Sequence, residues 1–137
     1  MADLIQFELV SPERLLVSRE MEMVVVPGSE GDFGALPGHA PLISEIRPGV
    51  IAVFEGGKVQ ERIFVAGGFA EVTNERCTVL AQQAMPLAEI DRLAADNELK
   101  IARDDLSAAK TDAERALAEH QITVAEAKLA ALDNPVY

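Results

Sequence analysis

The chain has 137 residues and a formal net charge of −11, because 23 Asp and Glu outnumber 12 Lys and Arg. This length corresponds to one domain, or to a small domain with an appendage. The acidic balance argues against nucleic acid or an anionic membrane surface as a partner, because contacts with phosphate need Lys and Arg. With 49% hydrophobic residues the chain can bury a core. Its longest uncharged stretches, residues 33–44 and 77–88, are far shorter than the roughly 20 residues of a membrane-spanning helix.

The N-terminus and the cysteine content bear on the cellular compartment. The first residues, Met1-Ala2-Asp3-Leu4, contain no basic run followed by an apolar core, so no secretory signal is recognisable. Cys77 is the one cysteine and cannot form a disulfide within the chain. Both observations predict a reducing, cytosolic compartment.

The composition changes near Pro86. All nine Gly and all five Phe lie at or before Phe69, whereas 13 of the 21 Ala lie in residues 88–131. Gly, Pro, Val and Phe favour turns and strands, and Ala, Leu, Glu, Lys and Arg favour helix. We therefore predict a β domain over residues 1–86 and a helical segment over residues 87–137.

The first part predicts short strands in close succession. Ile5, Phe7 and Leu9 alternate with polar residues, which is typical of a half-buried strand. Further strands are predicted at 15–19, 21–26, 50–54, 58–65, 69–72 and 77–81. Gly56-Gly57 and residues 73–76 lie between pairs of these runs and predict hairpin turns. Eight to ten short strands with a turn about every ten residues indicate an all-β sandwich or barrel.

The second part predicts two helices in an antiparallel hairpin. The first covers residues 87 to about 109, and Thr111-Asp112-Ala113-Glu114 is a capping box that begins a second helix ending near Leu132. The predicted face of the first helix contains Ile90, Ala94, Asn97, Ile101 and Asp105. The second helix has two stripes. One consists of Ala113, Leu117, His120, Val124, Ala127 and Ala131. The other consists of Ala118, Ile122, Ala125, Leu129 and Leu132. One stripe exceeds what a two-helix hairpin can bury, so it would meet the β domain, another subunit or, at times, nothing. Small side chains also make each contact weak.

The sequence offers little sign of a catalytic or metal site. It has no P-loop, and His39, His120 and Cys77 do not have the spacing of a zinc site. Asp104 and Asp105 are adjacent on a helix and do not face each other.

The densest segment is residues 31–42, in which Pro37-Gly38 predicts a turn. Two interpretations are open for this segment. It is either a tightly turned connection between strands, or a rigid loop that presents an acidic group and the imidazole of His39 to a partner.

Residues 24–42, which contain Pro37-Gly38-His39-Ala40-Pro41, resemble the hallmark of the epsilon subunit family of bacterial F-type ATP synthases, called delta in mitochondria. Further similarities are Arg47-Pro48-Gly49, residues 64–72, residues 78–81 and Ile90-Asp91, so the resemblance covers the whole chain. It implies an N-terminal β-sandwich of about ten strands followed by an α-helical hairpin.

The resemblance also implies a function. Members of the family are non-catalytic subunits of the central stalk, on the cytoplasmic face of the bacterial inner membrane. Their β domain binds the gamma subunit and the c ring, and so couples proton-driven rotation to ATP synthesis on the alpha and beta subunits. By this resemblance we expect partner docking through Ser29, Glu30, Gly31, Asp32 and His39, with Asp32 at the acidic position that meets the c ring. No cofactor, metal or catalytic residue is expected.

In some relatives the hairpin moves and regulates ATP hydrolysis, and it binds ATP through a motif of the form Ile-Asp-x-x-Arg-Ala. This chain has Ile90 and Asp91, but Ala94 stands where the arginine is expected. A triphosphate needs clustered cationic donors, so nucleotide binding is not expected. Strong inhibition is not expected either, because the second helix has only two cations, Arg115 and Lys128, beside four acidic residues from Asp112 to Glu126. We expect at most a weak regulatory role of the hairpin in ATP hydrolysis. An ATP-sensing regulatory module is the alternative function, and a small β-sandwich enzyme is a second alternative that no group of residues supports.

Overall fold

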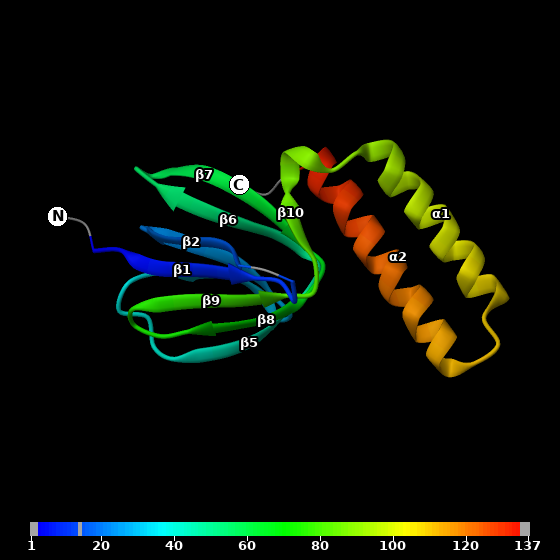
Figure 1. Ribbon diagram of the computed structural model, residues 1–137, viewed down its shortest axis with the longest axis horizontal. Coiled ribbons are helices and arrows are strands. Elements are labelled where there is room, and N and C mark those ends of the chain that lie inside the picture. The colour runs from blue at the N-terminus through cyan, green and yellow to red at the C-terminus, as the bar shows by residue number, and fades with distance from the viewer. Residues whose placement is uncertain (1–2, 14, 135–137) are drawn as a thin grey trace.

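The computed structural model describes residues 3–13 and 15–134. It contains a layered β domain and a helical hairpin at one end of it (Figure 1). The strands are β1 (Ile5–Val10), β2 (Leu15–Met21), β3 (Met23–Gly28), β4 (Gly31–Ala35), β5 (Leu42–Ile46), β6 (Gly49–Glu55), β7 (Lys58–Val65), β8 (Gly68–Val72), β9 (Arg76–Ala81) and β10 (Ala84–Pro86). The predicted all-β sandwich of about ten strands, followed by a helical hairpin, is confirmed.

The strands form one sheet that folds over on itself into two layers. Their order is β10-β7-β6-β3-β5-β8-β9-β1-β2, and β4 pairs with β3 beside this path. All the pairings are antiparallel except that of β1 with β9. Ile5, Phe7 and Leu9 of β1 are fully buried, as their alternation predicts. The core cluster lies between the layers and takes all its members from residues 5–81.

Two tight turns have the geometry that their residues predict. Gly56 and Gly57, between β6 and β7, both have positive φ, +64° and +72°. This is the backbone of a type I′ hairpin turn. Between β8 and β9, the Thr73 hydroxyl accepts hydrogen bonds from the backbone N–H groups of Glu75 and Arg76.

The first helix begins later than predicted. Residues Leu87–Glu89 form a single 3₁₀ turn, Ile90 is extended, and α1 covers Arg92–Ala108. Asp91 is its N-cap, since its carboxylate accepts a hydrogen bond from the backbone N–H of Leu93 at 3.2 Å. The capping box of the second helix is confirmed, because Thr111 Oγ1 accepts from the Glu114 N–H at 3.1 Å and α2 covers Asp112–Asp133.

The partly apolar face predicted for the first helix is not the face that is buried. Ile101 is 60% exposed, whereas Ala95 and Ala102 are buried. On α2, Ala118 and Ala125 are buried with the same spacing of seven residues. Methyl groups at this spacing let two helix backbones approach closely, and this close contact outweighs the burial of a larger side chain at a neighbouring position.

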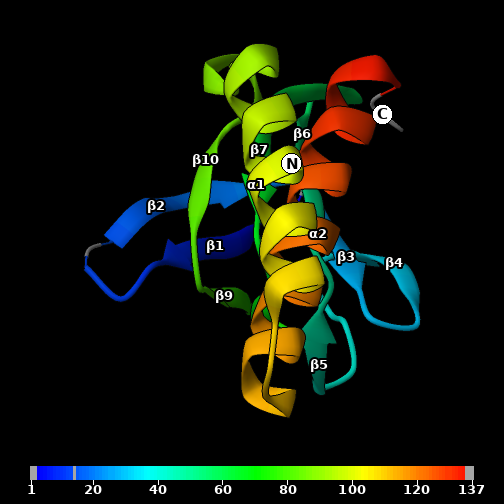
Figure 2. The same ribbon diagram turned by 90° about the vertical axis from the view of Figure 1, so that its right-hand side faces the viewer.

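The stripe of α2 that contains Leu117, Val124 and Ala131 lies partly against the β domain. In Figures 1 and 2, α2 lies between α1 and the β domain, and the α1–α2 connection points away from the strands. Val124 and Ala131 line cavities shared with the β domain, whereas Leu117 is 60% exposed. The β domain therefore covers only the C-terminal half of this stripe.

Replacing Gly68 tests the closest backbone approach in the β domain. Gly68 has φ +141°, and a Cβ there would overlap the carbonyl oxygen of Leu80 and lie 3.0 Å from the Cα of Ala81. We expect Gly68→Ala to lower the free energy of unfolding in urea by about 3 kcal/mol, because β8 and β9 would have to separate. Gly57→Ala is the control: it has positive φ but open space, so the cost is about 1 kcal/mol. Equal losses for the two variants would contradict this interpretation.

Candidate docking surfaces

The turn between β3 and β4 presents Ser29 and Glu30 to solvent. Gly28 pairs with Gly31, so these two residues form the whole connection, and both are exposed. A Cβ on Gly28 would lie 2.7 Å from the carbonyl oxygen of Gly31, and Gly31 has φ +134°. Glycine at both positions is therefore what permits so short a turn. We call residues 28–32 the docking turn.

Arg47 holds the docking turn in place. Its guanidinium donates hydrogen bonds to the carbonyl oxygen of Gly28 and to the Asp32 carboxylate. Its backbone N–H donates to the carbonyl oxygen of Pro27 at 3.0 Å. The Asp32 side chain keeps 26% of its surface exposed, so it remains available to a partner. No local pattern predicts this pair, because Arg47 lies fifteen residues from Asp32 on another connection.

His39 lies apart from the docking turn. It follows the far end of β4, where its Nδ1 lies 2.5 Å from the carbonyl oxygen of Ala40. The preceding Gly38 donates its N–H to the carbonyl oxygen of Asn74, in the β8–β9 turn, at 2.7 Å. The structure thus separates the two groups that the sequence placed in one dense segment. Residues 31–42 contain a strand with the acidic group at its start and the imidazole beyond its end.

Sequence reasoning missed a set of exposed apolar side chains on the outer face of the sheet. Ile43, Phe69 and Leu80 are 74%, 57% and 56% exposed. They lie on β5, β8 and β9, which are neighbouring strands, and Phe69 pairs directly with Leu80. Glu45 and Glu71 lie on the same face, because residues two apart on a strand point to the same side. We call Ile43, Phe69 and Leu80 the apolar sheet face. Its sequence signal was the apolar Phe69 at an outward position of the alternating run 68–72.

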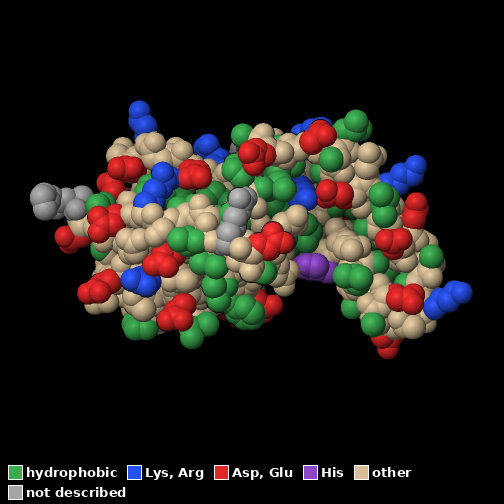
Figure 3. Space-filling model, viewed as in Figure 1, with side chains coloured by type: hydrophobic (Ala, Val, Ile, Leu, Met, Phe, Trp, Pro, Cys, Tyr) green, Lys and Arg blue, Asp and Glu red, His purple; other side chains and the backbone are tan. Residues whose placement is uncertain are grey.

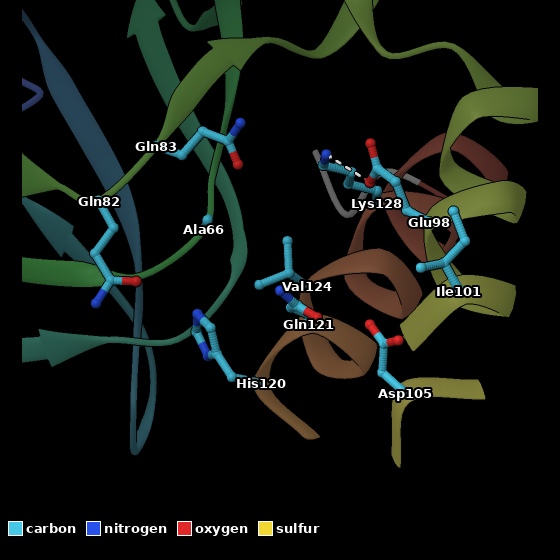
Figure 4. Close-up of a pocket in the computed structure, with 10 residues that line it drawn as sticks. All are labelled: Ala66, Gln82, Gln83, Glu98, Ile101, Asp105, His120, Gln121, Val124 and Lys128. Carbon is cyan, nitrogen blue, oxygen red and sulfur yellow. Dashed lines mark hydrogen bonds and ion pairs between the residues drawn. The ribbon is translucent and has the colours of Figure 1, made fainter. Parts of the chain in front are cut away.

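A cavity of about 430 Å³ separates the β domain from the hairpin. Figure 3 shows the hollow between the two parts, with the purple of a histidine at its inner end. It is lined by Ala66, Gln82, Gln83, Glu98, Ile101, Asp105, His120, Gln121, Val124 and Lys128 (Figure 4).

The charges on this cavity are poorly suited to an anion. The amine of Lys128 donates to the Glu98 carboxylate at 3.0 Å, and the Lys128 side chain is only 8% exposed. Asp105 adds a second carboxylate to the lining, and no Arg is among the ten lining residues. Ile90, Asp91 and Ala94, the positions of the nucleotide motif, are also outside this lining. Asp91 instead caps α1, and Ala94 is exposed on that helix.

Other reactive groups are isolated. Burial raises the pKa of the Cys77 thiol to about 12, so it stays protonated and unreactive at neutral pH. Over residues 3–13 and 15–134, His, Cys, Asp and Glu side chains form no cluster that could hold a metal ion. Within the same residues, neither helix combines the length and the hydropathy needed to cross a membrane.

Comparison with known sequences identifies relatives of this chain. Residues 4–87 match the model of the ATP synthase delta/epsilon chain, β-sandwich domain. The chain is 60% identical over 131 residues to the ATP synthase epsilon chain of Rhodospirillum rubrum, covering 96% of this chain and 98% of the relative. It is 55% identical over 132 residues to that of Paramagnetospirillum magneticum, covering 96% and 99%.

Solved structures agree with the sequence relatives. A chain in the Euglena gracilis mitochondrial ATP synthase OSCP/F1/c-ring structure superposes with a TM-score of 0.80 at 29% identity, over 94% of this chain and 81% of that one. A chain in the Tetrahymena thermophila central stalk/c-ring structure shares the fold, with a TM-score of 0.70 at 14% identity and coverage of 93% and 95%. The architecture is thus that of a β-sandwich with a helical hairpin from a rotary ATP synthase. The chain belongs to the ATP synthase epsilon chain family.

The Lys128–Glu98 pair predicts an asymmetry between two variants. Glu98→Ala removes the carboxylate and leaves the Lys128 ammonium buried, which we expect to destabilise the hairpin by about 1–2 kcal/mol. Lys128→Met keeps the aliphatic volume and leaves only the half-exposed Glu98, at a cost below about 1 kcal/mol. Thermal unfolding followed by the helical circular dichroism signal measures both. Equal losses for the two variants would contradict this asymmetry, because both remove the ion pair and only Glu98→Ala leaves a buried charge.

Proposed function

We propose that this chain is a non-catalytic subunit of the central stalk, which couples rotation of the c ring to ATP synthesis through the gamma subunit. The observation that carries this proposal is the apolar sheet face, together with membership of the epsilon chain family. Large apolar side chains gathered on one exposed face are typical of an interaction site. The hairpin packs elsewhere, so this face is open to a partner in the structure described.

The apolar sheet face has the chemistry of a surface that docks on gamma. Phe69 and Leu80 pair across β8 and β9, and Ile43 lies diagonally from Phe69 on the same face of β5, so aromatic and branched side chains are offered together. Glu45 and Glu71 add carboxylates beside them. A matching surface on gamma would be apolar at its centre and basic at its rim.

The docking turn is the part that we propose to meet the c ring. It differs from the apolar sheet face because its exposed residues, Ser29, Glu30 and Asp32, are polar or acidic. Polar loops of the ring can form hydrogen bonds with it without burying much apolar area. His39 lies apart from the docking turn and is not among the residues that line the hairpin cavity. We propose that it lies at the edge of the surface by which the β domain contacts the c ring.

We propose two functional units, residues 1–86 for docking and residues 87–137 for regulation. We propose that the chain is a peripheral subunit on the cytoplasmic face of a bacterial inner membrane. Contact of the hairpin with alpha and beta subunits would be weak, because α2 carries four acidic residues and two cations from Asp112 to Lys128, apart from His120. Nucleotide binding is not part of the proposal, since Lys128 is already engaged by Glu98 in a cavity that also holds Asp105.

Phe69 tests docking on gamma. Phe69→Asp should weaken binding to purified gamma subunit at least about tenfold, because burial of an aromatic side chain contributes about 1.5–3 kcal/mol. Leu117→Asp is the matched control, since Leu117 is similarly exposed but lies on the hairpin. Titration of labelled gamma with each variant gives the dissociation constants. Equal constants for Phe69→Asp and the unaltered chain would remove the apolar sheet face from the proposal.

Asp32 tests docking on the c ring. Asp32→Ala should lower retention of the c ring by the assembled stalk about tenfold and reduce proton-driven ATP synthesis in parallel, because a charge-assisted hydrogen bond contributes about 1.5–3 kcal/mol. Glu8→Ala is the control, because Glu8 is also a one-quarter exposed carboxylate in an ion pair with an arginine, Arg76, on the β domain. Unchanged retention and synthesis in Asp32→Ala would contradict the assignment.

A further inference from the structure

The docking turn and the end of the hairpin meet at a second, smaller cavity. It has a volume of about 170 Å³ and lies between the β domain and the last turns of α2. Asp32, Arg47 and Arg62 line it from the β domain, and Ala127, Ala131 and Asn134 line it from α2. The residues that shape the docking turn are therefore also part of the surface on which the hairpin rests.

Arg47 belongs to both surfaces, because it binds the docking turn and also lines the cavity beside the end of α2. Its guanidinium binds the Gly28 carbonyl and the Asp32 carboxylate. The segment around it is tied to the turn by the backbone, where the Ser29 N–H donates to the Glu45 carbonyl at 2.8 Å. A Cβ on Gly49 would lie 3.0 Å from the Pro27 side chain, which shows how closely these two segments pack. A displacement of Arg47 cannot leave the docking turn unchanged.

The end of α2 has a physical reason to prefer this wall. The last turn of a helix carries a partial negative charge from its unpaired carbonyl groups, and cations stabilise it. The last turn of α2 has no basic residue of its own. The β domain supplies Arg47 and Arg62 to the cavity beside that turn. Small side chains let α2 approach the wall, and Ala131 is only 8% exposed there.

We infer that Arg47 is a positioning residue shared by the docking turn and the hairpin, so that the ordered turn and the docked α2 stabilise each other. When α2 rests on the β domain, Arg47 lies beside the helix end, and its guanidinium keeps its hydrogen bonds to Gly28 and Asp32. When α2 leaves, Arg47 no longer packs beside the helix end, and the docking turn becomes less ordered. Such coupling is reciprocal, because each site must change the other by the same factor. This coupling concerns contacts within the chain, so it does not rest on the proposed function.

Amide hydrogen exchange in the isolated full-length chain tests the first direction. In Arg47→Ala, we expect amides of residues 124–133 in α2 to exchange about fivefold faster than in the unaltered chain. Asp32→Asn should shift the same amides in the same direction, because it releases Arg47 without removing it. The control is Arg76→Ala, which breaks an exposed ion pair with Glu8 on the β domain. Amides of Ala70 and Val79, whose side chains are buried in β8 and β9, serve as an internal reference.

Undocking α2 tests the reverse direction. Ala131→Lys adds bulk and positive charge opposite Arg47 and Arg62, so it should lift the end of α2 from the β domain. We then expect the Ser29 amide, in the docking turn, to exchange about fivefold faster. Ala94→Lys is the control, because Ala94 is exposed on α1.

Three results would overturn the inference. The α2 amides of Arg47→Ala could match those of Arg76→Ala, the Ser29 amide of Ala131→Lys could match that of Ala94→Lys, or the Ala70 and Val79 amides could accelerate equally and reveal a general loss of stability. Neither gamma nor the c ring is present in these measurements. Failure here would therefore leave the proposed stalk function standing, and failure of Asp32→Ala to affect the c ring would leave this coupling standing.

Discussion

Burial of alternating apolar residues between the two layers of one folded-over sheet is the interaction on which the rest of the molecule depends. The core cluster draws all its members from residues 5–81, so neither helix contributes to it. The two layers of the sheet bury each other's inner faces without the helices. The outer face of the sheet, its turns and its end are therefore available for other contacts. The apolar sheet face, the docking turn and the resting place of the hairpin occupy three such regions.

The hairpin is attached to this body by weak but specific contacts. The helices meet through Ala95, Ala102, Ala118 and Ala125, whose methyl groups give close approach but little buried area per residue. Ala127 and Ala131 likewise bury little area where α2 meets the β domain. Larger side chains such as Leu93, Ile101 and Leu117 remain exposed. A hairpin built in this way rests on the β domain at small energetic gain, so little free energy would be needed to detach it.

The sequence was sufficient where local chemistry decides the structure. Alternation fixed the buried side of β1, paired glycines fixed the β6–β7 turn, and the Thr111 capping box fixed the start of α2. It was insufficient where two distant segments compete for the same space. The face of α1 depends on how closely α2 can approach, and an isolated helix pattern favours Ile101 over Ala102. The Arg47–Asp32 and Lys128–Glu98 pairs likewise depend on topology, because each joins segments that no local spacing relates.

Net charge proves less informative than the placement of a few cations. The value of −11 is divided almost evenly, with 6 basic and 12 acidic residues in 1–86 and 6 and 11 in 87–137. Within that acidic background, Arg47 and Arg62 lie together beside the end of α2, and Lys128 is enclosed with Glu98. Because long-range charge is screened over about 8–10 Å in physiological salt, these local placements determine the contacts. Arg47 pairs with Asp32 beside the end of α2, whereas the one lysine of the larger cavity is engaged by Glu98. The same overall charge is therefore compatible with the proposed docking on protein surfaces, and the larger cavity has no lysine or arginine left to pair with a phosphate.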